Sequence, residues 1–247
     1  MGLYTVTQEP ARGLDRLLDL LFPPRCVACG AWGEWLCAAC VATLGEPPAP
    51  RCPRCAGPSR TGGLCGACRR GPRYLTGLRS VAAHRTPLRE AVHGVKYSGM
   101  HVLVAPLADI LHQYWAREGV AVDAVLPVPL HPSRVRYRGY NQSALLGAAF
   151  ARRAGLAYHE DWVVRARRTR SQVGLTPRER WENVWRAFAV TSPGVAGARI
   201  LLIDDVMTTG ATLEACAHAL RGAGAAEVWA LTLTRASRSR GRPPGAP

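Results

Sequence analysis

The stretch that decides the fold is residues 199–212, RILLIDDVMTTGAT. Its apolar run at residues 200–203 predicts a central strand that is buried on both faces of a parallel sheet. Two carboxylates, Asp204 and Asp205, end the run, and a loop of small and hydroxyl-bearing residues follows them. A helical pattern of apolar residues over 212–223 comes next. This order is typical of an α/β protein, in which ligands bind at the carboxyl ends of the strands.

The loop after the acidic pair has the composition of a phosphate site. Gly210 lets the backbone approach a ligand closely, and the threonine hydroxyls add hydrogen-bond donors. The N-terminus of the following helix offers N–H groups and the positive end of the helix dipole to an anion. The acidic pair could accept hydrogen bonds from sugar hydroxyls. We therefore predict a site for a ribose 5-phosphate, formed by Asp204, Asp205, Thr208, Thr209, Gly210, Ala211 and Thr212.

Other nucleotide sites do not fit this loop. A Walker A loop requires GxxxxGK followed by Ser or Thr, and a dinucleotide site requires GxGxxG after a strand, and the sequence contains neither. The purely structural alternative makes Asp204 and Asp205 surface residues and lets Thr208 or Thr209 cap the next helix. Capping explains one hydroxyl, but it explains neither the paired acids nor the glycine.

The composition indicates a globular protein with anionic partners. At 247 residues and 48% hydrophobic content, the chain can form one large domain or two modest ones. The apolar segment at residues 14–22 is interrupted by charges, so we expect neither export nor membrane insertion. The net charge of +15 favours phosphate-bearing partners, although arginine also serves as an ordinary solvated cation. Lys96 is the only lysine. It could simply stabilise the negative end of its helix dipole, but an arginine would do this equally well, so we favour a role in which Lys96 faces a phosphate.

Eight of the nine cysteines form four CxxC pairs within 43 residues. Two such pairs, seven to nine residues apart, can close a tetrahedral site of four thiolates. A disulfide framework is the alternative, but it suits small secreted chains. Residues 23–72 are rich in glycine and proline and poor in large apolar side chains, so bound metal would stabilise them in place of a core. We predict one or two structural Zn²⁺ ions, held by Cys26, Cys29, Cys37 and Cys40 and by Cys52, Cys55, Cys65 and Cys68.

Strand and helix patterns alternate after residue 73. We expect strands over 77–83, 121–128, 162–168 and 228–234, and helices from Thr86 to about Gly99, over 102–115 and over 141–154. The prolines of the segment LPVPLHPSRVRYRGYNQ, residues 126–142, predict a stiff loop that presents Arg134, Arg136 and Arg138 to pyrophosphate. A basic lid should follow in TRSQVGLTPRERWENV, residues 169–184, because Thr176, Pro177 and Glu179 form a capping-box start that anchors a helix at its base. An exposed charged hairpin is the alternative.

The apolar run, the two acids and TTGxT resemble the phosphoribosyl pyrophosphate (PRPP) motif of type I phosphoribosyltransferases. The resemblance implies that Asp204 and Asp205 take the 2- and 3-hydroxyls of the ribose, that residues 208–212 take the 5-phosphate, and that Mg²⁺ accompanies PRPP. Purine-salvage members place an aspartate where this chain has Thr208. The loop is therefore similar to the orotate type and supplies no general base of its own.

The CxxC pairs, Lys96-Tyr97, PVPLHPSRVRYRGYNQ and TTGAT together resemble the ComF family of competence-associated proteins, from about Leu14 to Arg235. The resemblance implies an N-terminal helix and double zinc ribbon at 1–72. It also implies a type I phosphoribosyltransferase fold with a parallel-sheet core at 73–235, and a disordered basic tail at 236–247. Arg134 and Arg138 would belong to the pyrophosphate loop, and the lid would extend to residues 168–186. The family is linked to natural transformation, in which incoming single-stranded DNA is handled in the cytoplasm. The resemblance therefore implies single-stranded DNA and competence or recombination proteins as partners.

Two classes of function follow from these patterns. The protein could be an enzyme that transfers the ribose phosphate of PRPP to an undetermined acceptor, or a binding protein whose basic surfaces hold single-stranded DNA. The zinc module and the tail would supply that surface, through Arg51, Arg54, Arg60, Arg69, Arg70, Arg238, Arg240 and Arg242. Trp32 and Trp35 could stack on bases, but we expect them to form the small core of the module. A salvage phosphoribosyltransferase or regulator is the less favoured alternative, because it needs no zinc module.

Overall fold

The computed structural model describes residues 3–6, 23–45, 49–71, 74–167 and 177–236. The apolar segment at 14–22, where an N-terminal helix was expected, the first half of the predicted lid (168–176) and nearly all of the predicted tail lie outside these residues. Within them, no helix is long and apolar enough to cross a membrane.

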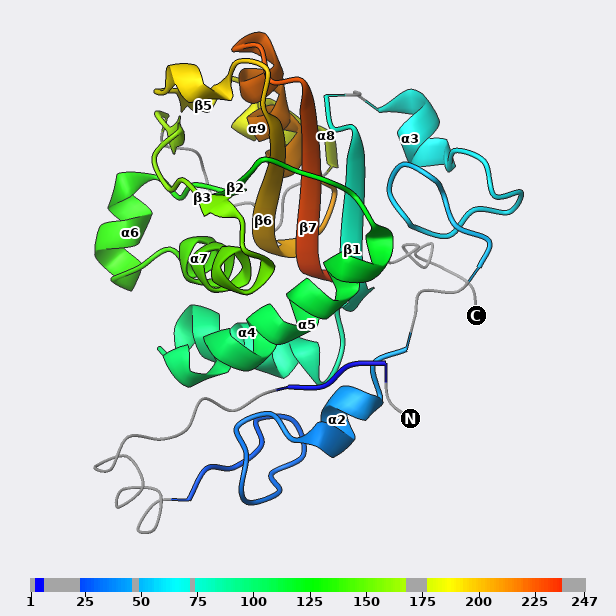
Figure 1. Ribbon diagram of the computed structural model, residues 1–247, viewed down its shortest axis with the longest axis vertical. Helices are drawn as coiled ribbons and strands as arrows, with labels where there is room; N and C mark the ends of the chain where they lie inside the picture. The colour runs from blue at the N-terminus through cyan, green and yellow to red at the C-terminus, as the bar shows by residue number, and fades with distance from the viewer. Residues whose placement is uncertain (1–2, 7–22, 46–48, 72–73, 168–176, 237–247) are drawn as a thin grey trace, which may run out of the picture.

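A five-stranded parallel sheet forms the centre of the molecule, in the order β1-β7-β6-β2-β3 (Figure 1). The strands are β1 (Gly77–Ala83), β2 (Ala124–Pro127), β3 (Ala157–Tyr158), β6 (Arg199–Met207) and β7 (Glu227–Arg235). The predicted central strand is confirmed, because residues 200–203 are fully buried. It does not end at the acidic pair, however. Residue 204 pairs with 232 and residue 206 with 234, so β6 carries both carboxylates within the strand.

Helices cover both faces of the sheet. One face packs against α4 (Leu88–Tyr97), α5 (Val104–Glu118) and α7 (Gln142–Ala154), while α8 (Pro177–Val184) and α9 (Ala211–Gly222) lie on the other side (Figure 1). The side chains of β6 alternate between two apolar clusters, as the pleat of a strand requires. Leu201 and Ile203 belong to the cluster with α4, α5 and α7, and Ile200 and Leu202 belong to the cluster with α9.

The segment that was predicted as a stiff arginine loop is a short helix instead, α6 (Pro132–Arg138). Pro132 occupies the first turn, where its missing N–H is not needed, and His131 caps the helix by accepting a hydrogen bond from the Ser133 N–H. Gly139, with a φ of 89°, ends it in the left-handed region. The helix expected from Thr86, with Thr86 as its cap, begins at Leu88 instead, and Pro87 is its N-cap residue.

Two short strands form a separate antiparallel sheet, β4 (Val163–Arg165) and β5 (Phe188–Val190). The strand predicted over 162–168 is therefore shorter than expected, and β3 and β5 were missed. Strands of two or three residues are too short to show a hydrophobic period. The turns η1 (His101–Leu103) and η2 (Pro193–Val195) complete the part of the α/β domain that the structure describes.

The two cysteine segments lie at different places on the α/β domain (Figure 1). The first segment, with α2 (Ala38–Ala42), packs Leu36, Val41 and Leu44 into the apolar cluster of α4 and α5. The second, with α3 (Gly66–Arg70), lies beside β1 and joins the cluster of α9. Trp32 was expected in a small core, but it is 59% exposed and stacks under the Arg25 guanidinium instead. Trp35 does pack against the apolar cluster.

Candidate functional site

Asp205 lies at the carboxyl end of the central strand and forms an ion pair with Lys96. The Lys96 Nζ is 3.0 Å from Asp205 Oδ2 and donates a hydrogen bond of 3.2 Å to Oδ1. The Asp205 side chain is almost fully buried, on the face of the sheet that α4 covers. The last turn of α4 brings Lys96 to it. The structure therefore places the only lysine at the predicted site, but on a carboxylate.

Asp204, the preceding residue of β6, is held by the start of α7. Its Oδ1 accepts hydrogen bonds from the Ser143 hydroxyl at 2.8 Å and from the Asp205 N–H at 2.9 Å. The Ser143 N–H donates to the Asn141 side chain, which caps α7, and the Asn141 amide donates to the Val128 carbonyl beyond β2. The two neighbouring strands are thus tied together at the acidic pair.

Burial and neighbouring charges shift the pKa values of Asp204, Lys96 and His84. Burial and the Asp205 carboxylate raise the pKa of Asp204 to about 7, although Lys96 and the Ser143 hydrogen bond oppose the shift. Burial lowers the pKa of Lys96, but the two carboxylates outweigh it, so the pKa lies above its usual value. Nearby, His84 follows β1, with Nδ1 2.8 Å from the Thr234 hydroxyl oxygen. Burial and Lys96 lower its pKa, which keeps the imidazole neutral at pH 7.

The predicted phosphate loop follows β6 directly. Gly210 has a φ of 81°, in the left-handed region that favours glycine, and it is the N-cap residue of α9. The Thr209 hydroxyl oxygen accepts a hydrogen bond from the Ala211 N–H at 3.3 Å. Ala211 and Thr212 belong to the first turn of α9, so the backbone N–H groups of that turn and the helix dipole face the carboxyl edge of the sheet. This is the geometry of an anion site.

Two of the predicted arginines lie on α6, and a third arginine, which was not predicted, lies on β4. Arg134 and Arg138 lie on α6, where Arg138 donates a hydrogen bond to the Gln142 side chain and stacks over the Tyr97 ring. Arg165, on β4, is only 4% exposed. Burial and the positive charge of Arg134 lower the pKa of Arg165 to about 10, while Asp204 opposes the shift. The guanidinium of Arg165 therefore lies within electrostatic reach of both Arg134 and Asp204.

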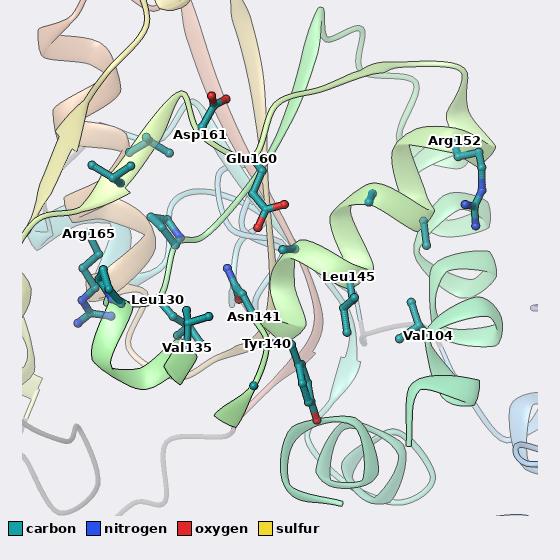
Figure 2. A pocket seen from close by; sticks show the side chains of 18 residues that line it. Val104, Leu130, Val135, Tyr140, Asn141, Leu145, Arg152, Glu160, Asp161 and Arg165 are labelled. Atoms are coloured by element: carbon teal, nitrogen blue, oxygen red, sulfur yellow. The ribbon is translucent and has the colours of Figure 1, made fainter. Parts of the chain in front are cut away.

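An open groove of about 720 Å³ runs along α7 between α6 and β4 (Figure 2). Its floor is apolar, with Val135 from α6 and Leu145 from α7. Figure 2 shows Arg165 at one end and Arg152 at the other, with Glu160 and Asp161 between them on the rim.

The cysteines form two clusters, as predicted. In each cluster the four Sγ atoms lie within 4.8 Å of one another. The Sγ–Sγ distances include 3.8 Å for Cys26–Cys40, 3.6 Å for Cys29–Cys37 and 3.8 Å for Cys55–Cys65. A tetrahedral zinc ion with Zn–S bonds of about 2.3 Å requires edges of about 3.8 Å, so both donor sets fit structural zinc.

Several site residues were missed in the sequence. Ser143, His84 and Arg165 carry no motif. Ser143 bonds to Asp204, while His84 lies within electrostatic reach of Lys96 and Arg165 within electrostatic reach of Asp204. The NQS string at 141–143 held one usable signal. An asparagine that caps a helix fixes the next turn, and Ser143 lies in that turn.

Comparisons with known proteins agree with this architecture. A model of the double zinc ribbon domain matches residues 17–69, and a model of the phosphoribosyl transferase domain matches residues 150–245. The DNA utilization protein YhgH of Salmonella typhi is 35% identical over 177 residues, which are 69% of this chain and 78% of that protein. Competence protein F of Haemophilus influenzae is 37% identical over 116 residues, 46% of this chain and 51% of that protein.

Among solved structures, the glutamine PRPP amidotransferase of Bacillus subtilis superposes with a TM-score of 0.35 at 23% identity, over 51% of this chain and 25% of that one. The family models and the relatives decide the assignment, since they cover the zinc ribbon, the phosphoribosyltransferase domain and most of the YhgH protein. The chain therefore belongs to the ComF family, in which a double zinc ribbon precedes a phosphoribosyltransferase domain.

Proposed function

We propose that the protein binds PRPP at the carboxyl edge of its sheet. The ribose hydroxyls would be held by Asp204 and Asp205, and the 5-phosphate by residues 208–212. The observation that carries this proposal is the Lys96–Asp205 pair, buried directly ahead of the glycine that starts α9. The structural alternative requires exposed carboxylates, whereas Asp205 is 4% exposed and Asp204 accepts two hydrogen bonds.

The same edge supplies positive charge for the pyrophosphate group. Arg134 and Arg138 on α6 and Lys96 on α4 approach the site from two elements. Carboxylate oxygens are the protein ligands that Mg²⁺ prefers, and the ion would neutralise the phosphates of PRPP when both are bound. At this edge of the sheet, the neutral His84 can accept a hydrogen bond, and the charged Lys96 next to Asp205 can donate one.

Isothermal titration calorimetry with PRPP and Mg²⁺ tests this function. Asp204→Asn should weaken PRPP binding by at least about tenfold, because an amide accepts fewer hydrogen bonds from the ribose. Asp123→Asn is the matched control. Asp123 pairs with Arg199 at the opposite end of β6, so its substitution should leave the affinity unchanged. If the wild type, Asp204→Asn and Asp123→Asn bind PRPP with equal affinity, Asp204 is excluded as a ribose ligand.

We further propose that the protein binds single-stranded DNA in the cytoplasm, during DNA uptake and natural transformation. The net charge of +15 supports this, and so do aromatic rings exposed beside arginines. Trp32 is paired with Arg25 at 3.5 Å, Tyr97 is 64% exposed under Arg138, and Tyr137 on α6 is 95% exposed. The names of the relatives, a DNA utilization protein and a competence protein, point in the same direction.

Pyrophosphate release separates catalysis from binding alone. The purified protein would be incubated with PRPP, Mg²⁺ and a panel of nucleobases and oligonucleotides. Release that requires an oligonucleotide supports a phosphoribosyltransferase acting on nucleic acid, and release with a nucleobase alone supports the salvage alternative. PRPP and DNA binding without release identifies a binding protein that uses PRPP as a ligand.

A further inference from the structure

The second cysteine cluster is bonded to both sides of the phosphate loop. This cluster consists of Cys52, Cys55, Cys65 and Cys68, and its first CxxC turn contains Arg54. The loop at 208–210 connects β6 to α9. Hydrogen bonds from the Cys52–Cys55 turn reach α9 on one side and the strand end next to Met207 on the other.

On the α9 side the connection runs through Glu214. The Arg54 guanidinium donates to Glu214 Oε1 at 2.8 Å, and the side chains are only 12% and 14% exposed. The other carboxylate oxygen accepts from the Tyr74 and Leu75 N–H groups at 3.0 and 3.1 Å. Glu214 also donates its own N–H to the Gly210 carbonyl at 2.9 Å. The first turn of α9 is therefore held by a residue within the first CxxC turn and by the chain that follows the cluster.

On the strand side the connection runs through Arg235. Its guanidinium donates to the Cys55 carbonyl oxygen and lies 3.6 Å from the Cys55 sulfur. Gly57 leaves room for it, since a Cβ at that position would collide with the guanidinium. Arg235 pairs in register with Met207, and the next residue, Ala236, donates its N–H to the Met207 carbonyl at 2.8 Å. The residue just before the loop is thus held by a strand that is bonded to the cluster.

The first cluster has no such connection. Its segment, residues 23–45, reaches the domain through Leu36, Val41 and Leu44, which pack with α4 and α5. Among the described residues, this segment makes no hydrogen bond to β6, to the loop or to α9. The two cysteine clusters have the same composition, but among the described residues only the second is hydrogen-bonded to the elements that flank the phosphate loop.

We propose that the second cluster, and not the first, positions the phosphate loop, so that metal bound to Cys52, Cys55, Cys65 and Cys68 and a phosphate ligand bound at 208–212 stabilise each other. The proposal rests on the proposed PRPP site. Without the metal, the Cys52–Cys55 turn loses its fixed geometry, and Arg54 and Cys55 no longer hold Glu214 and Arg235. Thermodynamic linkage makes the effect reciprocal, because a ligand that binds the ordered loop must retain the metal by the same factor.

Matched cysteine variants test the asymmetry. Cys65 and Cys37 are the N-cap residues of α3 and α2, and both are half-buried. Cys65→Ser should raise the Kd of PRPP by about 5- to 150-fold, the usual range of coupling between sites. Cys37→Ser should change it by less than about twofold. Equal effects of the two variants would overturn the proposal.

A second pair of variants keeps all eight cysteines. Arg54→Gln breaks the bond to Glu214, while Arg199→Gln breaks an ion pair at the opposite end of β6. Only Arg54→Gln should weaken PRPP binding. In the wild type, saturating PRPP should strengthen the binding of one zinc ion per chain, measured by equilibrium competition with a chelator, by the same factor as the metal strengthens PRPP binding. A zinc affinity that PRPP leaves unchanged would contradict the linkage.

Hydrogen exchange separates this proposal from the proposed function. In the protein without ligand, the amides of residues 209–214 should lose protection in Cys65→Ser and keep it in Cys37→Ser. If wild-type protein fails to bind PRPP but shows this difference, the loop is positioned by the cluster and its ligand is another anion. If the exchange is identical in both variants, the cluster does not position the loop.

Discussion

Asp205→Asn should destabilise the protein as well as weaken PRPP binding, because it leaves Lys96 unpaired. The Lys96 and Asp205 side chains are 22% and 5% exposed, and their charged atoms are 3.0 Å apart. At an effective dielectric constant of about 20, Coulomb attraction at this distance is about 5 to 6 kcal/mol, before desolvation is subtracted. Breaking one side of such a pair costs about 3 to 5 kcal/mol in measured cases. The asparagine retains an acceptor for Lys96, so we expect about 3 kcal/mol.

Thermal unfolding, with and without PRPP, measures both effects. For a chain of 247 residues, about 3 kcal/mol corresponds to a fall in Tm of about 6 to 12 °C. The double variant Lys96→Met/Asp205→Asn removes the unpaired cation and should recover about 2 kcal/mol, while PRPP affinity stays low. Asp123→Asn, in an exposed pair, should leave the transition almost unchanged. Full stability of Asp205→Asn, or a double variant less stable than the single one, would refute the reasoning.

Three further outcomes follow from the structure. Metal analysis of the purified protein should find two zinc ions per chain, and fewer than two would contradict the assignment of both clusters. Binding of PRPP should strengthen as pH rises through about 7, because the ionised Asp204 carboxylate is the better acceptor for the ribose hydroxyls. Ser143→Ala removes a hydrogen bond to the ionised carboxylate, so the midpoint of the pH dependence should move to higher pH. A PRPP affinity that does not change with pH would exclude Asp204 as a ribose ligand. Fluorescence anisotropy should show that the affinity for single-stranded DNA falls steeply as the salt concentration rises. The affinity should also weaken in Trp32→Ala and Tyr137→Ala, but not in Val102→Ala, which replaces another exposed apolar side chain. Equal DNA binding by the three variants would exclude stacking of bases on the two rings.

Local signals in the sequence determined most of the longer elements and the residue types of the candidate site. Gly155 ends α7 with a φ of 65°, as its position after an alanine-rich helix predicts, and residues 77–83 form β1 as expected. The CxxC spacing determined both thiolate clusters, because two cysteines three residues apart share one turn whatever surrounds them. The TTGAT loop was recognisable for the same reason, since its residue types are set by the turn and the anion that it can hold.

Only the tertiary structure decided what those residues contact. Lys96 is 109 residues from Asp205, Ser143 is 61 residues from Asp204, and Arg54 is 160 residues from Glu214. No local pattern encodes such pairs, because they depend on the order β1-β7-β6-β2-β3 and on which helix covers which face. The faces of the domain on which the two cysteine clusters pack depend on the same order. Short stretches of sequence therefore determined the residue types at the candidate site, while packing between distant segments determined which of those residues form ion pairs and hydrogen bonds.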